Sequence, residues 1–459
     1  MDPRIRPLEQ AHRYAVAWLE SLEKRPMTAS ATADEIAEAL GTELPQTPTD
    51  PAEVVELLAT ACEPGLTAMP SGRFYGMVIG GSHPAALAAD WLTAAWDQNA
   101  GLRTVTPAAA AAEEVAASWL LDLLGLPADA GVGFPTGATT ANVVGLLCAR
   151  DRMLGSLGWD VAAQGLIGAP RLRVLVGAEA HESVRWALRY LGLGEPEVVD
   201  ADAEGRINPG ALATALRSGG PAVVVLQAGN VHSGAFDPFG EAIAAAHEAG
   251  AWVHVDGAFG LFAAAAPSLR HLTAGIEAAD SWTTDAHKTL NVPYDCGIAI
   301  VRDRAVLRQV LGKRGAYLIH DEAGEPFDSV LEMSRRARGF TVWAVLRALG
   351  RDGVAGLVDG FHRRAAEFAE GVRAIPGAAV LNEVDYTQVC ATFGDDERTR
   401  EVVRRVLADG TAWIAGSQWH GRAVLRISVS NWATTSDDVR RSLSALHEAV
   451  RALDGAATR

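Results

Sequence analysis

Two charged side chains stand at the ends of short apolar segments, where they could act on a bound ligand. Lys288 lies in the stretch SWTTDAHKTLNVPYDCGIAIV, residues 281–301. Lysine is seldom fully buried without a partner, so this amine is either a surface group with a packed stem or a chemically used amine. Asp256 ends the segment AWVHVD, where a carboxylate needs a backbone turn, an arginine or a cationic ligand group as its partner.

Two further segments could hold other parts of the same ligand. GVGFPTGATTAN, residues 131–142, combines three glycines with the start of a predicted helix. Free N–H groups there would bind a phosphate, with the hydroxyl groups of Thr139 and Thr140 in reach, although such turns also serve packing alone. His181 follows the predicted strand RLRVLV at the head of a helix, which suits a helix cap as well as a ligand contact.

In chain order, these four features match the needs of one cofactor. Pyridoxal phosphate requires a phosphate site, a flat group on its ring face, a carboxylate for its ring nitrogen and an amine for a Schiff base. The glycine-rich turn, His181, Asp256 and Lys288 supply these groups in that order. Each feature is weak alone, so the prediction of pyridoxal phosphate rests on their joint occurrence.

Strands and helices alternate from about residue 71 to residue 340, which would bring the four features to one edge of a sheet. Short Val- and Ile-rich segments predict buried strands at RLRVLV, AVVVLQ, AWVHVD and GIAIVR. Helices are predicted between them over Ala108–Leu124, Ala138–Arg152, Glu182–Leu191 and Phe239–Glu248. This alternation predicts a mainly parallel sheet with ligands beyond the carboxyl ends of its strands. One strand-like segment, ADSWTT, separates Asp256 from Lys288, so we expect these two side chains side by side.

The remaining segments predict two smaller parts. Residues 1–70 are expected to be helical, with an interruption at GTELPQTPTDPAE and a new helix starting at Asp50-Pro51. This segment is too small to bury its apolar faces alone, so we expect it to pack on a partner surface. Residues 341–459 predict a small α+β domain with helices over Val342–Leu349 and Phe361–Arg373, the strand RAVLRISVS and a last helix near Ser436–Leu453. We therefore predict an N-terminal helical segment (1–70), a large cofactor-binding domain (71–340) and a small C-terminal domain (341–459).

Composition disfavours several classes of function. The chain has 459 residues, is 49% hydrophobic and carries a net charge of −16, which disfavours binding to nucleic acid or to an anionic membrane. No apolar run approaches the roughly 20 residues of a membrane span, and the first residues lack an apolar signal region. The four cysteines show no metal-binding spacing. We expect a cytoplasmic protein without a metal site.

The chain resembles the group II pyridoxal-phosphate-dependent amino-acid decarboxylases, the family of aromatic-amino-acid and glutamate decarboxylases. The resemblance runs from about Arg73 to the final helix and rests on TGATTAN, AHESVRWA, HVDGAFG, DAHKTLNVPYDCG, SRRARGFTVWAVLRALGRDG and LRISVSNWATTSDDV. It implies the fold-type-I, aspartate aminotransferase-like architecture. It also implies a homodimer with active sites at the interface, in which the N-terminal helices wrap the partner subunit.

The resemblance assigns roles to individual residues. Eight contacts to the cofactor are implied: Lys288 as the internal aldimine, Asp256 at the pyridinium nitrogen, His181 and Ala258 on the two ring faces, and Ala138, Thr139, His287 and Asp285 at the phosphate. The implied reaction is decarboxylation of an L-amino acid through an external aldimine and a quinonoid carbanion, whose protonation gives an amine.

One departure from the family leaves the end of the reaction open. The decarboxylases carry a tyrosine in a mobile loop that protonates the carbanion, and here the loop KRGAYLIHDEAGEPFDSVLEMSRR has Phe327 near that position. Relatives with phenylalanine there tend to let the carbanion meet oxygen, which gives an aldehyde, ammonia and CO2. Phe327 is therefore our candidate catalytic position, with Tyr317 and His320 as alternative proton donors. Oxidative deamination or another lyase reaction is the second hypothesis. A non-catalytic cofactor-binding protein is the third, which the retention of Lys288, Asp256 and His181 disfavours.

The sequence leaves the amino-acid substrate open. The segment RFYGMVIGGSHPAAL lies where relatives shape the side-chain pocket, and it places Met77 and Val78 where aromatic-specific relatives have bulk. In GNVHSGAFDPF, Asn230 and His232 are expected either to contact substrate or cofactor or to belong to a solvated loop.

Overall fold

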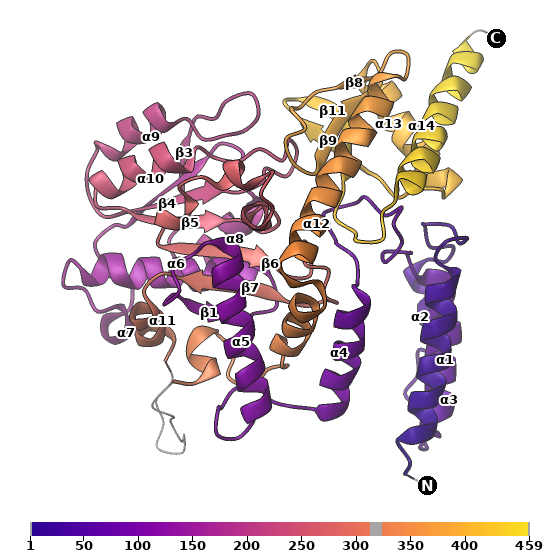
Figure 1. The fold of residues 1–459 in the computed structure, drawn as a ribbon, viewed down its shortest axis with the longest axis horizontal. Helices are drawn as coiled ribbons and strands as arrows, with labels where there is room; N and C mark the ends of the chain where they lie inside the picture. The colour runs from indigo at the N-terminus through magenta and orange to yellow at the C-terminus, as the bar shows by residue number, and fades with distance from the viewer. Residues whose placement is uncertain (1, 313–323, 458–459) are drawn as a thin grey trace.

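The strands of the protein form two sheets in the computed structural model, which describes residues 2–312 and 324–457 (Figure 1). The large sheet has the order β1-β7-β6-β5-β4-β2-β3. Its strands are β1 (Gly131–Gly133), β2 (Arg173–Gly177), β3 (Glu197–Val199), β4 (Ala222–Gln227), β5 (Trp252–Asp256), β6 (Ser281–Asp285) and β7 (Gly297–Val301). Neighbours from β6 to β3 are parallel, whereas β7 is antiparallel to β6 and to β1. The predicted α/β class and the four predicted strands are confirmed.

The centre of the sheet brings the predicted site together. Asp256 at the end of β5 is in register with Gln227 on β4 and with Thr283 on β6. β6 ends at Asp285, three residues before Lys288. Every residue of β5 and β6 is buried, because helices cover both faces of the sheet. Asp256 and Lys288 therefore follow neighbouring parallel strands, as expected.

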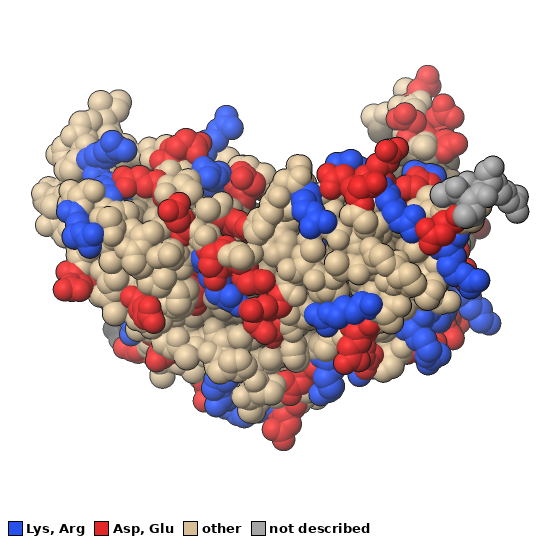
Figure 2. Space-filling model, turned by 90° about the horizontal axis from the view of Figure 1, so that it is seen from above, with Lys and Arg blue, Asp and Glu red and all other residues tan. Residues whose placement is uncertain are grey.

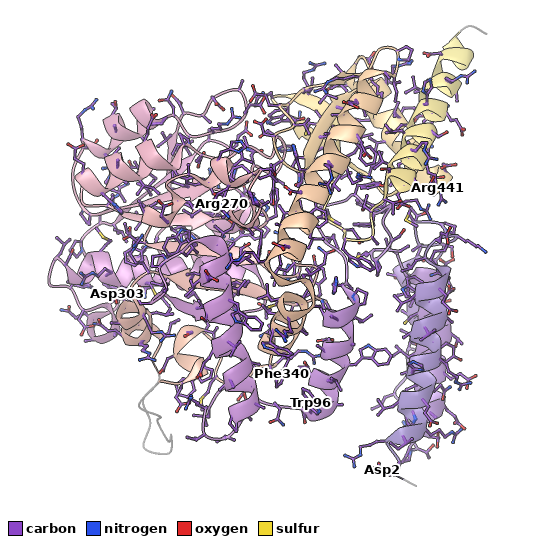
Figure 3. All side chains as sticks on the ribbon, viewed as in Figure 1. Asp2, Trp96, Arg270, Asp303, Phe340 and Arg441 are labelled. Atoms are coloured by element: carbon purple, nitrogen blue, oxygen red, sulfur yellow. The ribbon has the colours of Figure 1, made fainter. Side chains whose placement is uncertain are left out.

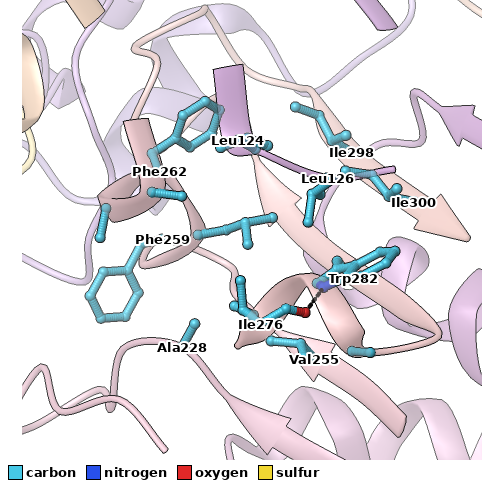
Figure 4. Close-up of a cluster of buried hydrophobic side chains, with 14 of the residues drawn as sticks. Leu124, Leu126, Ala228, Val255, Phe259, Phe262, Ile276, Trp282, Ile298 and Ile300 are labelled. Carbon is cyan, nitrogen blue, oxygen red and sulfur yellow. Dashed lines mark hydrogen bonds between the residues drawn. The ribbon is translucent and has the colours of Figure 1, made fainter. Parts of the chain in front are cut away.

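Helices and short 3-10 turns surround this sheet. They are α4 (Pro84–Trp96), α5 (Pro107–Leu124), α6 (Ala138–Gly155), α7 (Val161–Gln164), α8 (Glu182–Tyr190), α9 (Pro209–Leu216), α10 (Phe239–Glu248), α11 (Arg304–Leu311), η2 (Leu261–Ala265), η3 (Arg270–Thr273), η4 (Ile276–Ala278) and η5 (Pro326–Ser329). The hydrophobic core has one cluster on each face of the sheet, because successive side chains of a strand point to opposite faces. On β4, Val224 and Leu226 belong to the first cluster, while Val223 and Val225 belong to the second. Figure 4 shows part of the first cluster, where the indole N–H of Trp282 donates to the carbonyl oxygen of Ile276 at 2.9 Å.

The second sheet belongs to the C-terminal part of the chain. It is antiparallel, with the order β10-β11-β9-β8. Its elements are β8 (Ala379–Val380), β9 (Gln388–Thr392), β10 (Ala415–Trp419) and β11 (Arg422–Ser428), with helices α13 (Asp396–Asp409) and α14 (Ser436–Ala457).

One long helix, α12 (Gly339–Arg373), joins the two sheets. Two helices were predicted there, and a break within α12 is observed, because the backbone at Gly350 is non-helical with a φ of 60°. Near the start of α12, Phe340 points toward Trp96 of α4, and their ring centroids lie 5.1 Å apart (Figure 3). The predicted boundary between the large and the small domain, after residue 340, falls inside α12 and stays a prediction.

The N-terminal helices stand beside the body of the molecule (Figure 1). They are α1 (Ile5–Ser21), α2 (Ala33–Leu40) and α3 (Pro51–Cys62), followed by η1 (Glu63–Gly65). The carboxylate of Asp50 accepts from the N–H of Ala52, so the predicted helix start at Asp50-Pro51 is confirmed. Leu8 and Leu58 are 58% and 55% exposed, which leaves this segment with uncovered apolar surface.

The surface carries charges of both signs. Figure 2 shows basic and acidic side chains interspersed on one face of the molecule. Across residues 2–312 and 324–457, no helix has the length and apolar character that crossing a membrane requires. The same residues contain no group of three His, Cys, Asp or Glu side chains arranged to hold a metal ion.

Candidate active site

A cavity of about 410 Å³ opens beyond the carboxyl ends of β4, β5 and β6. Eight of the nine site residues predicted from the sequence line it: Ala138, Thr139, His181, Asp256, Ala258, Asp285, His287 and Lys288. Parallel strands explain this convergence, because the segments that follow them emerge at the same edge of the sheet. The ninth residue, Phe327, does not line the cavity.

Lys288 is held by the carboxylate at the end of β6. Its Nζ lies 3.1 Å from Oδ2 of Asp285, and its backbone N–H donates to the carbonyl oxygen of the same residue. The other carboxylate oxygen of Asp285 is buried and has no hydrogen-bond partner in the described structure. The chain near Gly80 packs closely on this turn, since a Cβ there would lie 2.5 Å from the carbonyl oxygen of Lys288. The lysine is therefore a cavity residue rather than a surface group.

Asp256 is 5% exposed and is held by neutral donors. Its Oδ1 accepts from the N–H of Ala258 at 3.2 Å, and its Oδ2 accepts from Nδ2 of Asn142 at 3.0 Å. In the described part of the chain no lysine or arginine forms a salt bridge with it, since Lys288 pairs with Asp285 instead. A buried carboxylate without a cation suits a positively charged ligand group.

His181 both caps a helix and lines the cavity. Its Nδ1 accepts from the N–H of Ser183 at the start of α8 and lies 2.8 Å from the hydroxyl oxygen of that residue. Burial lowers the pKa of His181, and the nearby Asp256 carboxylate opposes this effect. A neutral ring with an accepting Nδ1 carries its proton on Nε2. The helix cap is therefore confirmed, and a ligand contact stays a prediction for this residue of the cavity wall.

The N-terminus of α6 fits a phosphate group. Gly137 precedes the helix, and no side chain caps it, so its first N–H groups are left for a ligand. A Cβ at Gly137 would lie 3.3 Å from Cε1 of His287, which keeps this end of the cavity narrow. The ring of His287 stacks on Tyr294 at 4.2 Å, and its Nδ1 accepts from the N–H of Cys296. Burial lowers the pKa of His287.

These observations fit pyridoxal phosphate. An uncapped helix start, a buried carboxylate without a cation and a lysine lie around one cavity, and a flat imidazole lines the same cavity. Together with the mainly parallel sheet, they define a pyridoxal-phosphate enzyme of fold type I.

Comparison with known proteins gives the family. The model of the pyridoxal-dependent decarboxylase conserved domain matches residues 34–393. L-2,4-diaminobutyrate decarboxylase of Rhizobium meliloti (strain 1021) is 31% identical over 414 residues, which cover 83% of this chain and 80% of that relative. Aromatic-L-amino-acid decarboxylase of Rattus norvegicus is 26% identical over 449 residues, 93% of each chain. The crystal structure of Oryza sativa TDC with PLP and tryptamine superposes with a TM-score of 0.91 at 25% identity over 97% of each chain.

This chain belongs to the pyridoxal-dependent decarboxylase family. It is a pyridoxal-phosphate-dependent amino-acid decarboxylase, a carboxy-lyase, and pyridoxal 5'-phosphate is its cofactor.

Sequence reasoning missed two asparagines that organise the site. Asn142 bonds to Asp256, and Asn291 fixes the turn after Lys288. The Asn291 amide donates to the carbonyl oxygens of Lys288 and Ser430, and its Oδ1 accepts from the N–H groups of Gly81 and Trp432. Asn291 has a φ of 55°, which asparagine tolerates better than most residues. The only available signal was a polar residue within an apolar segment.

The wall contributed by residues 77 and 78 is strained. Both Met77 and Val78 have a φ of 54°, which is unusual for any side chain and especially for a β-branched one. Both residues line the cavity, as does Val231 from the segment 229–239. In that segment Asn230 is buried and donates to Glu179, whereas His232 is partly buried and bonds to Ser417. Neither residue lines the cavity, and a contact with substrate or cofactor stays a prediction.

The geometry of the cavity does not test the three residues that were considered for the protonation step. Phe327 lies in η5 with a fully buried side chain, and its backbone N–H donates to the carbonyl oxygen of Gly101 at 3.2 Å. Its catalytic role stays a prediction. Tyr317 and His320 lie outside the described residues.

Proposed function

We propose that this enzyme decarboxylates an L-amino acid at the cavity between Asp256 and Lys288. Bound pyridoxal phosphate supplies an electron sink for the electrons left when the bond from Cα to the carboxylate breaks. Lys288 would hold the cofactor through its Nζ, at the place that a substrate amine would occupy. The observation that carries the proposal is one cavity lined by a lysine, a carboxylate without a cation and an uncapped helix start.

The surrounding residues have distinct roles in this proposal. Asp256 pairs with the ring nitrogen and keeps it protonated, because a buried anion stabilises a nearby cation. His181 and Ala258 contact the two faces of the ring. Ala138, Thr139 and His287 bind the phosphate, while Asp285 keeps His287 and Lys288 in place from 3.5 and 3.1 Å.

The environment of Arg426 favours a substrate with an anionic group that this side chain binds. This arginine on β11 is 9% exposed, and burial lowers its pKa. It forms no salt bridge with the described residues, and its Nε has no hydrogen-bond partner there. Its Nη1 donates to the carbonyl oxygen of Val231, which lines the cavity. We infer that Arg426 binds a carboxylate of the substrate, so Arg426→Gln should raise KM more than it lowers kcat.

Decarboxylation with oxidative deamination is the second candidate. It is favoured by Phe327, which lies near the position where the resemblance to the family expects the tyrosine that protonates the carbanion. Amine formation consumes no oxygen, whereas the oxidative reaction consumes oxygen and releases ammonia and an aldehyde.

One experiment decides between these reactions. Amino acids are screened one by one with the purified enzyme and pyridoxal phosphate, while CO2, ammonia and oxygen are measured together. CO2 with an amine and no oxygen uptake supports the first candidate, and equal oxygen uptake and ammonia release support the second. Absence of CO2 from every amino acid would contradict both.

The enzyme is proposed to act as a homodimer. Leu8 and Leu58 on the N-terminal helices and Trp96 on α4 are about half exposed, which is costly for a free surface. A second copy that covers these helices would remove this cost. Sedimentation should give twice the mass of 48.2 kDa, and Leu8→Glu with Leu58→Glu should shift the protein toward the monomer. A monomeric wild type at micromolar concentration contradicts this proposal.

A cytoplasmic location is also proposed. The four cysteines are free thiols, three of them buried, as is typical of proteins in a reducing compartment. Cell fractionation with an antibody against the chain tests this location, and recovery in an extracellular fraction contradicts it.

A further inference from the structure

A line of hydrogen bonds runs from the core of the sheet to Asp256. The indole Nε1 of Trp252 lies 2.9 Å from Oγ of Ser281, and this Oγ lies 2.8 Å from Nδ1 of His254. Nε2 of His254 lies 2.9 Å from Oδ1 of Asn142, whose Nδ2 lies 3.0 Å from Oδ2 of Asp256. All five residues are buried, and they come from β5, β6 and α6.

The two ends of this line, together with a neutral imidazole between them, fix the direction of every bond. An indole N–H can only donate, and an ionised carboxylate can only accept. Trp252 therefore donates to Ser281, whose hydroxyl donates to His254. The imidazole then donates through Nε2 to Asn142, whose amide donates to Asp256. This order requires a neutral imidazole, and burial lowers the pKa of His254 to about 4, which keeps it neutral.

The packing around His254 shows that the line is built into the fold. Gly145 lies one helical turn after Asn142 on α6, and a Cβ there would lie 2.5 Å from Cε1 and 2.6 Å from Nδ1 of His254. Real Cβ atoms do not approach other atoms this closely, so the imidazole occupies space that only glycine leaves. A glycine within a helix costs about 1 kcal/mol relative to alanine.

We propose that Asn142, His254 and Ser281 are positioning residues that hold Asp256 as an oriented anion facing the cofactor. Asn142 fills one lone pair of Oδ2, and the N–H of Ala258 fills one of Oδ1, so the carboxylate cannot rotate without losing both bonds. Because every proton in the line points toward Asp256, the line stabilises its ionised form and disfavours its protonated form. This inference rests on the proposed pairing of Asp256 with the ring nitrogen.

The same asparagine also reaches the other ring contact. Its Nδ2 lies 3.4 Å from Oγ of Ser183, which in turn lies 2.8 Å from Nδ1 of His181. Asn142 thus connects the residue proposed to pair with the ring nitrogen and the residue proposed to contact the ring face.

Two hydroxyl deletions on β6 form a matched pair. Ser281 and Thr283 are both fully buried and two residues apart, but the Thr283 hydroxyl has no hydrogen-bond partner in the described structure. The measured quantity is the Kd for pyridoxal 5'-phosphate of the full chain, by equilibrium dialysis. Ser281→Ala should raise this Kd about fivefold, because the hydroxyl group that accepts from Trp252 and donates to His254 is lost, while Thr283→Val should leave it within twofold. Equal values for the two variants overturn the proposal.

Replacing the hydrogen-bond donor at position 142 by an acceptor gives a second test. Asn142→Asp replaces the donor by an oxygen of the same shape, so two carboxylates face each other. The titratable groups around them are His254 on β5, His181 at the head of α8 and Lys288 after β6. We expect the Kd to rise at least tenfold over the wild type at pH 8. The ratio of the two Kd values should fall at pH 5.5, because the introduced carboxyl group donates again once it is protonated.

The Kd ratios at the two pH values distinguish a purely structural defect from the proposed role of Asn142. A purely structural defect would give the same ratio at both pH values, and this result overturns the proposal, as does a ratio near one at pH 8. The variant Asp256→Ala tests the proposed role of Asp256 separately from the role of the three positioning residues. If Asp256→Ala binds the cofactor like the wild type, the role of Asp256 itself is wrong. If Asp256→Ala loses affinity while Asn142→Asp does not, only the positioning line is wrong.

Discussion

Replacing Gly145 by alanine should destabilise the enzyme, although alanine is the better helix former. Gly145 lies in the middle of α6, where Ala for Gly would ordinarily add about 1 kcal/mol to the free energy of unfolding. The added Cβ would lie 2.5 Å from Cε1 of His254, which is about 1 Å inside the usual contact distance between carbon atoms. Because His254 is fully buried, it cannot swing into solvent to make room.

The balance of terms gives the sign of the effect. Overpacking of this kind costs about 1–3 kcal/mol. Moving the imidazole also weakens its bonds to Ser281 and Asn142, each of which contributes about 1 kcal/mol. Against a gain of about 1 kcal/mol from helix propensity, we expect a net loss of about 2 kcal/mol in the free energy of unfolding.

Gly155, in the same helix, provides the control for this prediction. Gly155 is the last residue of α6, and nothing lies within 4 Å of a Cβ placed there. Urea unfolding of both variants, followed by circular dichroism, should show Gly155→Ala equal to or above the wild type in stability and Gly145→Ala below it. If both variants match or exceed the wild type, the close packing of α6 on His254 is wrong.

Three further predictions address the turn after Lys288, pH and the loop. Asn291→Gly keeps the left-handed backbone but removes the side-chain amide, so urea unfolding should show a loss of about 3 kcal/mol; an unchanged midpoint contradicts the role of Asn291. Because the folded pKa of His254, about 4, lies below its unfolded value of 6.5, the stability it gives is present above pH 6.5 and is lost as the pH falls toward 4. Its share of the free energy of unfolding should drop by about 2 kcal/mol from pH 7 to pH 5, and an equal drop in His254→Gln would show that other groups cause it. Phe327→Tyr should shift products from aldehyde toward amine, as product analysis can measure, and no shift means that position 327 is not that of the proton donor.

The fold was predictable where local pattern and tertiary packing agree. The valine-rich segments at β2, β4 and β5 are covered on both faces, so their composition identifies them as strands without further information. Two helices were predicted within α12, and the backbone at Gly350, with a φ of 60°, is non-helical and separates the two parts. Glycine adopts a positive φ of this kind more readily than other residues, so local propensity and structure agree at this position.

The site was predictable where chain order and parallel topology suffice. Asp256 and Lys288 follow neighbouring strands, so their proximity follows from the pattern of strands alone. Asn142 and Asn291 could not be assigned in this way. Asn142 meets His254 across 112 residues, and Asn291 meets Ser430 across 139 residues, so their partners are known only once the chain is folded. Phe327 was chosen from the resemblance, and its burial in η5 gives no contact with the cavity from which a role follows.

Chemical trapping of the cofactor tests whether Lys288 is the residue that holds it. Lysine occurs at only three positions in this chain, Lys24, Lys288 and Lys313, so the assignment has few alternatives. The purified enzyme with pyridoxal 5'-phosphate is reduced with borohydride and digested, and the peptides are examined by mass spectrometry. We predict the added mass of the reduced cofactor on the peptide that carries Lys288, and its loss in Lys288→Ala. The added mass on Lys24 or Lys313, or on no lysine at all, would contradict the site described above.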